Sequence, residues 1–451
     1  MAFSNDVLSI TSNVFDARWN VGVEVGTPVF VTFSFGDSRA AYDTQHPNGF
    51  TLWTEQAKSY IRQAFQIWDR ASGIHFIEVP DSAGGQIRVS LYDMTGTLNS
   101  VGQQASGFGY YPSYRTSSGV GIEPSYNNLG GDLFLNSNFF ADPTTFAPGQ
   151  SGFSVALHEI GHTIGFKHPF EGTPVIDPAH DNANYTVMSY TRSGPSTVLG
   201  SVDIEASQIY YGKADLSYNW DPTSLTLSIF GSSANEILLG TNLADVISAG
   251  GGNDIIRGGP GNDTIDGGEG LDTSLYGRNR TSYSIAPTSS GIIVTDSSGT
   301  DGSDALVNVE RLQFLDLVLA LDTQGNAGNA YRLYQAAFNR TPDQAGLSFW
   351  THQLDFGVDI QTVAAGFVNA AEFKAVYGVN PTHSHIVDLM YQNVLGRAGE
   401  PAGISFWVGQ LDRGLSIGAL LEGFAVSSEN HGIVDPKIAQ GIVLDHTAFL
   451  V

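Results

Sequence analysis

Residues 158–169 read His158-Glu159-Ile160-Gly161-His162-Thr163-Ile164-Gly165-Phe166-Lys167-His168-Pro169. Two histidines four apart on a helix lie one turn above each other on one face, so His158 and His162 can bind one metal ion. Gly165 suits an abrupt helix end, because glycine tolerates the left-handed backbone that brings His168 back toward the same ion. Three imidazole ligands leave the fourth tetrahedral position to water, and Glu159 lies beside them as a general base. The spacing predicts a catalytic zinc site.

An amphipathic core helix that carries histidines by chance is the alternative interpretation, but five fixed positions of uncommon residue types favour the zinc site. A second signal is Met188, which follows His168 by 20 residues. The extended zincin motif places a methionine turn beneath the metal at this point. A methionine in an apolar run is usually a core residue, so Met188 is informative only together with the histidines.

These residues resemble the metzincin metallopeptidases, and the serralysin branch in particular. The resemblance rests on the histidine motif with Pro169, on the turn Met188-Ser189-Tyr190, and on the glycine repeats described below. It implies the zinc ligands His158, His162 and His168. It further implies that Glu159 activates the metal-bound water and that Tyr190 ligates the metal or stabilises the transition state.

The composition limits the partners. The chain has 451 residues, no cysteine, and a formal net charge of −25 at pH 7. This excludes a disulfide framework, disfavours nucleic acid and anionic membranes as partners, and suits divalent cations. No apolar run approaches the roughly 20 residues of a membrane span, and the N-terminus lacks an ordinary signal peptide. The resemblance instead implies secretion through a type I channel that reads an uncleaved C-terminal signal, and the apolar end Ala448-Phe449-Leu450-Val451 fits this.

Before the histidine motif, alternating apolar residues predict strands over 28–35, 86–92 and 131–136, and helical spacing predicts a core helix over 53–68. We expect the strand at 132–136 to edge the cleft and pair with substrate, with an ordinary internal strand as the alternative. Residues 106–128 are rich in Gly, Ser and Tyr and predict a loop that lines the cleft. Residues 203–212 resemble the closing helix of a serralysin catalytic domain.

A nine-residue period follows. Its units begin at residues 231, 240, 249, 258 and 267, with an acidic residue at position six and an apolar residue at position eight in nearly every unit. The central units match the calcium-binding parallel β-roll, in which glycines form tight turns and aspartates supply hard oxygen ligands. A flexible acidic linker is the alternative, but it would not keep aspartate and isoleucine in phase. The predicted calcium ligands are Asp245, Gly252, Asp254, Gly259, Gly261, Asp263, Gly268, Gly270 and Asp272.

From residue 326 the chain turns helical and repeats itself at an offset of 57 residues, for example Tyr334 with Tyr391 and Trp350 with Trp407. The unit resembles a domain of unassigned function found in bacterial secreted and surface-layer-type proteins. We expect the pairs Phe349-Trp350 and Phe406-Trp407 to form the repeat cores.

The predicted architecture is multidomain. It consists of an α+β zincin domain over residues 1–221, an RTX β-roll with capping strands over 222–325, and an all-α tandem repeat with a C-terminal secretion signal over 326–451. The predicted function is a secreted, calcium-dependent zinc endopeptidase that hydrolyses protein or peptide substrates. Two alternatives stay open: a non-catalytic surface-layer or adhesion module on a zincin fold, and a narrow-specificity protease that processes a surface layer. We also expect the helical pair to contact a cell-surface or surface-layer partner.

Overall fold

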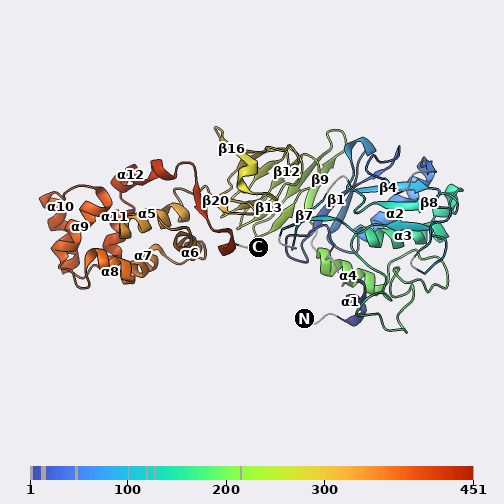
Figure 1. The fold of residues 1–451 in the computed structure, drawn as a ribbon, viewed down its shortest axis with the longest axis horizontal. Helices are drawn as coiled ribbons and strands as arrows, with labels where there is room; N and C mark the ends of the chain where they lie inside the picture. The colour runs from blue at the N-terminus through green and yellow to red at the C-terminus, as the bar shows by residue number, and fades with distance from the viewer. Residues whose placement is uncertain are drawn as a thin grey trace. The chain divides into compact units, whose positions relative to one another are not determined.

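The computed structural model describes residues 4–11, 17–45, 49–99, 101–117, 120–125, 128–213 and 216–449. Figure 1 shows the helices and strands of the chain. The chain divides into two compact units. The first comprises Met1–Gly268 and Ser284–Val307, and the second comprises Glu269–Tyr283 and Asn308–Val451. Among the helices that the structure describes, none combines the length and the apolar character that a bilayer crossing requires.

The first unit begins with a mixed sheet in the order β3-β1-β4-β8-β5, with β2 paired to β4. Its strands are β1 (Val29–Phe35), β2 (Phe50–Thr51), β3 (Ile74–Glu78), β4 (Ile87–Tyr92), β5 (Gly107–Gly109) and β8 (Leu133–Asn136). Strands β1, β3, β4 and β8 run parallel, whereas β5 runs antiparallel to β8. A separate hairpin is formed by β6 (Tyr114–Ser117) and β7 (Val120–Pro124).

The helices of this part are α1 (Asn5–Thr11), α2 (Glu55–Asp69), α3 (Ser151–Thr163) and α4 (Ser201–Tyr211). The predicted helix at 53–68 is confirmed as α2, which Thr54 caps by accepting the Ala57 N–H. Its apolar stripe is core, as expected, since Phe65 and Trp68 are buried. The indole N–H of Trp68 donates to the Leu157 carbonyl at 3.0 Å, which fixes α2 against the helix that carries the histidines.

The prediction that residues 132–136 edge the cleft is wrong. Strand β8 is internal, because β4 pairs with one side of it and β5 with the other. The edge strand is β5, which lies inside the stretch 106–128 that was expected to be a loop. Its glycines give no apolar alternation, so the strand has no local signal and forms by pairing with β8.

The β-roll begins with β9 (Ser217–Asp221), which pairs antiparallel with β10 (Thr226–Phe230). Parallel pairing then stacks β12 (Asp245–Ser248) on β10 and β14 (Thr264–Asp266) on β12. The same sheet continues through β18 (Ser303–Val307), β17 (Ile292–Asp296) and β16 (Tyr283–Pro287). In the opposite layer of the first unit, β11 (Ile237–Leu239) pairs with β13 (Ile255–Arg257). The position-eight residues Leu238, Ile247, Ile256 and Ile265 are fully buried, which explains the period.

Direct contacts join the roll to the part of the first unit that precedes it in sequence. Asn242 donates to the Gly84 carbonyl at 2.7 Å and contacts the Thr32 hydroxyl at 2.5 Å. Arg257 donates to the Val21 carbonyl at 3.0 Å. A division at residue 221 falls inside the β9–β10 hairpin, so the three-part division stays a proposal.

In the second unit, β15 (Thr273–Leu275) pairs with β19 (Arg311–Gln313), and β20 (Val318–Ala320) and β21 (Ile442–Leu444) follow in order. The helices of this unit are α5 (Asn326–Phe338), α6 (Gln344–Asp355), α7 (Ile360–Asn369), α8 (Ala371–Tyr377), α9 (His383–Leu395), α10 (Pro401–Asp412), α11 (Ile417–Ala425) and α12 (Ser428–Ile438). Short 3₁₀ turns occur in both units, at Asp81–Ala83, Pro143–Phe146, Arg280–Ser282 and His446–Ala448.

The tandem repeat is confirmed, because α9 to α12 each begin 57 residues after α5 to α8. The ion pairs repeat as well: Arg340 contacts Glu372 at 2.6 Å, and Arg397 contacts Glu429 at 2.5 Å. The prediction that both Phe-Trp pairs form the repeat cores is correct only for their tryptophans. Trp350 packs on Phe367, and Trp407 packs on Phe424. Phe349 and Phe406 are each 53% exposed and are not core residues. Leu450 and Val451 lie outside the described residues.

Candidate metal centre

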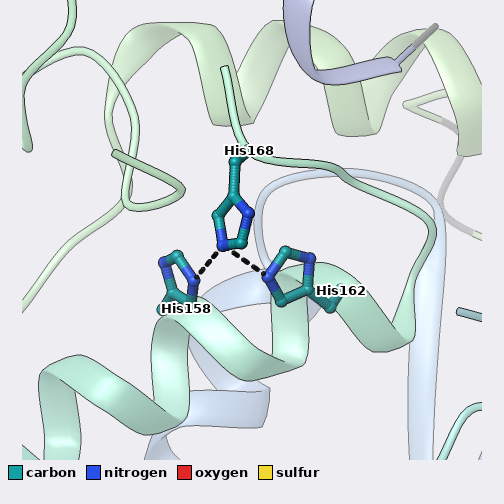
Figure 2. A group of neighbouring side chains, drawn as sticks. All are labelled: His158, His162 and His168. Atoms are coloured by element: carbon teal, nitrogen blue, oxygen red, sulfur yellow. Dashed lines mark hydrogen bonds between the residues drawn. The ribbon is translucent and has the colours of Figure 1, made fainter. Parts of the chain in front are cut away.

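Helix α3 carries two of the three histidines. His158 and His162 lie on successive turns of α3, and the helix ends at Thr163. Gly165 then adopts a φ of +103°, and a Cβ at this position would lie 2.1 Å from the Ala17 carbonyl, so only glycine fits the turn. The chain returns after this turn and brings His168 over the helix (Figure 2).

The three imidazoles converge through their Nε2 atoms. Nε2 of His168 lies 3.2 Å from Nε2 of His158 and 3.1 Å from Nε2 of His162. Figure 2 marks both contacts with dashed lines. The Nδ1 atoms face the protein: His158 donates to the Val187 carbonyl at 2.7 Å and His162 to the Phe166 carbonyl at 2.6 Å. Nδ1 of His168 lies 2.9 Å from the Glu171 carboxylate.

This donor set fits a metal ion. Because the Nδ1 atoms of His158 and His162 carry the protons, their Nε2 lone pairs both point toward His168, and lone pairs at this separation repel unless a cation lies between them. Nitrogens bound at 2.0–2.1 Å to a tetrahedral zinc lie about 3.3 Å apart. Within the described part of the chain, these three residues are the group of at least three His, Asp or Glu side chains whose ligand atoms all lie within 4.8 Å of one another.

The protonation states agree with this assignment. Burial, together with the neighbouring histidines and Arg192, holds the pKa of His158 well below its usual value. Burial likewise lowers the pKa of His162 to about 3 and that of His168 to about 4. All three imidazoles are therefore neutral near pH 7, which is the form that binds metals.

Glu159 lies beside the histidines and contacts the edge strand. Its side chain is buried, and Oε2 accepts the Gly109 N–H at 2.8 Å. Burial raises the pKa of Glu159 to about 8, while Gly109 and Arg192 act in the opposite direction. A Cβ on Gly109 would lie 2.1 Å from the Glu159 carbonyl, so glycine is required for β5 to lie this close to α3. Sequence reasoning missed Gly109.

Tyr190 and Met188 lie where the motif predicts. The Tyr190 ring is 4.6 Å from the His168 ring and 5.6 Å from the His158 ring, measured between centroids. Met188 is fully buried beneath α3, and a Cβ on Gly161 would lie 2.3 Å from its sulfur. The structure therefore brings together all five residues predicted for the zinc site.

Two further residues, Asp203 and Arg192, hold the backbone around the histidines in place. No pattern in the sequence predicted this role. Asp203 of α4 is buried and accepts the Thr186 hydroxyl at 2.6 Å and the Val187 N–H at 2.8 Å. Arg192 donates to the Ser154 hydroxyl at 2.8 Å and, weakly, to the Val187 carbonyl at 3.4 Å. Asp203 fixes the segment after Tyr185 against α4, and Arg192 fixes it against α3 through Ser154. Neither residue has a fixed spacing from the histidines.

The predicted calcium residues occupy turns of the roll. Asp245, Asp254, Asp263 and Asp272 are at most 1% exposed. Positive φ angles occur at all five predicted glycines, Gly252, Gly259, Gly261, Gly268 and Gly270. Burial raises the pKa of Asp245 to about 7, and burial with neighbouring carboxylates raises that of Asp263 to about 9. Carboxylates in this environment are costly to ionise unless a cation binds them.

A neutral triad of imidazoles with a carboxylate in reach defines a mononuclear metal centre of the kind that zinc hydrolases use. Comparison with known families agrees. Residues 37–193 match the Matrixin family, and residues 239–273 match the RTX calcium-binding nonapeptide repeat in four copies. Residues 325–377 and 364–434 match a domain of unknown function, DUF4214.

Individual relatives point to the same class. A serralysin of Proteus mirabilis is 26% identical over 183 residues, which cover 39% of this chain and 36% of that protein. Metallopeptidase AprA of Pseudomonas marginalis is 27% identical over 248 residues, covering 49% and 48%. A hatching enzyme of Paracentrotus lividus is 35% identical over 186 residues, covering 38% and 28%. The matches span less than half the length of each of these relatives.

The chain therefore combines a Matrixin-type region that is similar to serralysin-type metallopeptidases, a region that matches RTX calcium-binding repeats, and a C-terminal helical region that matches a domain of unknown function.

Proposed function

We propose that the protein is a calcium-dependent zinc endopeptidase that hydrolyses peptide bonds in protein substrates. The observation that carries the proposal is the convergence of three imidazole Nε2 atoms, all within 4.8 Å of one another, beside the buried carboxylate of Glu159. A zincin fold that had lost activity would have no need to retain this carboxylate against the edge strand. The serralysin-type relatives support the same reaction class.

The residues divide the work of hydrolysis. His158, His162 and His168 would hold the zinc ion, which would act as a Lewis acid toward the scissile carbonyl and lower the pKa of water to about 7. A zinc cation beside Glu159 would offset the effect of burial on its pKa and keep it ionised. The Glu159 carboxylate then takes the proton of the attacking water and delivers it to the leaving amine. The Tyr190 hydroxyl donates a hydrogen bond to the negative charge that develops on the carbonyl oxygen.

The substrate pairs with β5. As the edge strand of the sheet, β5 leaves one row of backbone donors and acceptors for an extended peptide, and Gly109 places that row against Glu159. Backbone hydrogen bonds between β5 and the peptide fix the position of the substrate but do not distinguish between substrate side chains. The substrate class is therefore extended or unfolded protein.

Calcium folds the roll. We assign it to the carboxylates of Asp245, Asp254, Asp263 and Asp272 and to the backbone turns at Gly252, Gly259, Gly261, Gly268 and Gly270. Calcium is abundant outside cells and scarce inside, so an acidic roll suits a chain that is exported before it folds.

We propose that the chain is secreted by the type I route. We also propose a cell-surface or surface-layer partner for the helical pair, whose half-exposed Phe349 and Phe406 are available for contact.

The test is cleavage of a denatured protein by the full chain in excess calcium. Activity is expected to disappear on addition of 1,10-phenanthroline, which removes zinc and leaves calcium in place, and to return when zinc is added back. Cleavage that persists after measured loss of zinc would contradict a zinc mechanism. A zinc-loaded, folded chain that cuts no protein substrate would favour the non-catalytic alternative.

A further inference from the structure

In the roll, aspartates of successive stacked turns lie in one register, and we call this row the acidic ladder. The acidic ladder continues beyond the nine-residue repeats. Ile265 of β14 pairs with Ile247 of β12 on one side and with Leu306 of β18 on the other. Asp263, Asp245 and Asp304 precede these residues by two positions and so share one register. Asp245 N–H donates to Oδ1 of Asp263 at 2.9 Å, and Asp263 N–H donates to Oδ1 of Asp304 at 3.1 Å. Asp304 thus occupies the next step of the ladder.

The turn that carries Asp304 has the form of a repeat unit. Residues 299–307 read Gly299-Thr300-Asp301-Gly302-Ser303-Asp304-Ala305-Leu306-Val307, with glycine at positions one and four, aspartate at six and leucine at eight. The family match to the nine-residue repeats ends at residue 273, because β16 and β17 interrupt the period before this unit.

The turn stacks directly on the repeat unit that begins at Gly258. Gly302 has a φ of +76°, and a Cβ there would lie 1.6 Å from the Gly261 carbonyl oxygen. The Ser303 N–H donates to the Asn262 side chain at 2.8 Å, and the Ala305 N–H donates to the Asp263 carbonyl at 2.8 Å. The two turns therefore face each other as neighbouring units of a roll do.

Asp263 supplies a second, independent sign of a ligand. It is 1% exposed, and its Oδ2 atom has no hydrogen-bond partner. The equivalent oxygen of Asp245 accepts the Thr241 N–H at 2.6 Å. Asp304, Asp245 and Asp301 lie close enough to Asp263 to raise its pKa. A buried carboxylate oxygen without a donor, among further carboxylates, is unfavourable unless a cation binds it.

We propose that a calcium ion binds between the turns formed by residues 258–263 and 299–304, with Asp263 and Asp304 as its carboxylate ligands. Hard oxygens from side chains and turn carbonyls match calcium, which takes six to eight such ligands. The ion attaches the β17–β18 hairpin to the roll. One side of this site, the turn 299–304, lies outside the recognised repeats. The site does not depend on the peptidase activity.

The first test counts calcium ions on the full chain by native mass spectrometry. Asp304→Asn keeps an oxygen for the Asp263 N–H but removes the charge, and it is expected to bind one ion fewer than the natural protein. Asp316→Asn is the matched control, because it removes an equal charge from an exposed carboxylate that accepts the Arg280 N–H. The control is expected to keep the full count. An unchanged count in folded Asp304→Asn overturns the proposal.

The second test needs no variant and so remains decisive if Asp304→Asn fails to fold. Crystals of the full chain are grown in calcium and exchanged with terbium, and an anomalous peak is expected about 2.4 Å from carboxylate oxygens of both Asp263 and Asp304. Peaks at the repeat turns with none between these two residues overturn the proposal.

Discussion

Asp203 accepts the backbone N–H of Val187 at 2.8 Å, and the carbonyl of that same Val187 accepts the Nδ1 proton of His158 at 2.7 Å. A carboxylate on α4 is thereby linked through the backbone of one residue, Val187, to a predicted metal ligand on α3. The same carboxylate accepts the Gly200 N–H at 2.8 Å. Asp203 therefore orients the imidazole and holds the methionine turn, although it never contacts the metal.

The first prediction concerns this link. Asp203→Ala leaves buried N–H and hydroxyl donors unpaired and is expected to cost about 2–4 kcal/mol of unfolding free energy. Zinc affinity is expected to fall by about 10- to 100-fold, as for other partners of metal-bound histidines. Chemical denaturation and competition with a zinc-binding dye measure the two effects. Glu205→Ala, an exposed change on the same helix, should stay within about 0.5 kcal/mol. Similar zinc affinities for the two variants would show that Asp203 has no role in orienting His158.

The second prediction concerns pH. Burial raises the pKa of Asp132 to about 8, although its oxygens accept the Arg88 N–H and the Tyr42 hydroxyl. Because the folded state holds this proton more tightly than the unfolded chain, the stability it contributes is full below about pH 4 and is lost as the pH rises through about 8.

Asp132→Asn keeps an oxygen for the Arg88 N–H and cannot ionise. We expect this variant to lose less stability than the natural protein between about pH 5 and about pH 8. Thermal midpoints measured across this range, with zinc and calcium saturating, check the expectation. If the thermal midpoints of the two proteins changed in parallel with pH, Asp132 would already be ionised at about pH 5, and the prediction would be wrong.

The third prediction concerns the second unit. Arg311 of β19 is buried and pairs with Asp322 and with Asp355 of α6, the latter at 3.2 Å. Asp355→Ala leaves this guanidinium only partly compensated and is expected to cost about 3 kcal/mol. The control is Asp412→Ala, which removes an exposed pair with His383 and should cost less than about 1 kcal/mol. Equal losses would mean that the Arg311 pair is not structural.

This pair also bears on how the helical region is tested. A chain that ends before residue 326 would lose Asp355 and also β21, which pairs with β20. Full-length variants of the exposed Phe349 and Phe406 therefore test a surface partner more cleanly than truncation. Loss of binding to cell envelopes with unchanged peptide cleavage would support the proposed role in location.

The zinc site was predictable because its information is local. Helical spacing placed His158 and His162, and Gly165 predicted the turn that returns His168. The repeat period likewise predicted buried position-eight residues. Each of these signals lies within about twenty residues of chain, where backbone geometry alone determines which side chains meet.

The edge strand β5 and the roles of Gly109 and Asp203 were not predictable, because they depend on contacts between residues far apart in the sequence. Gly109 contacts Glu159 only because β5 pairs with β8, and Asp203 contacts Val187 only because α4 packs beneath the turn. Neither contact leaves a period or a fixed spacing in the sequence. Residues 299–307 around Asp304 have the pattern of a repeat unit. They do not continue the nine-residue period, because β16 and β17 lie between them and the earlier units.

The central claim is that Glu159 acts as the base of a zinc peptidase, and the most direct test combines zinc stoichiometry with turnover in Glu159→Ala. The account predicts one zinc ion per chain at the histidine site in both proteins. Cleavage of denatured protein should fall by at least about 10²-fold in the variant. Glu205→Ala should cleave normally. Undiminished cleavage by zinc-loaded Glu159→Ala would contradict the account.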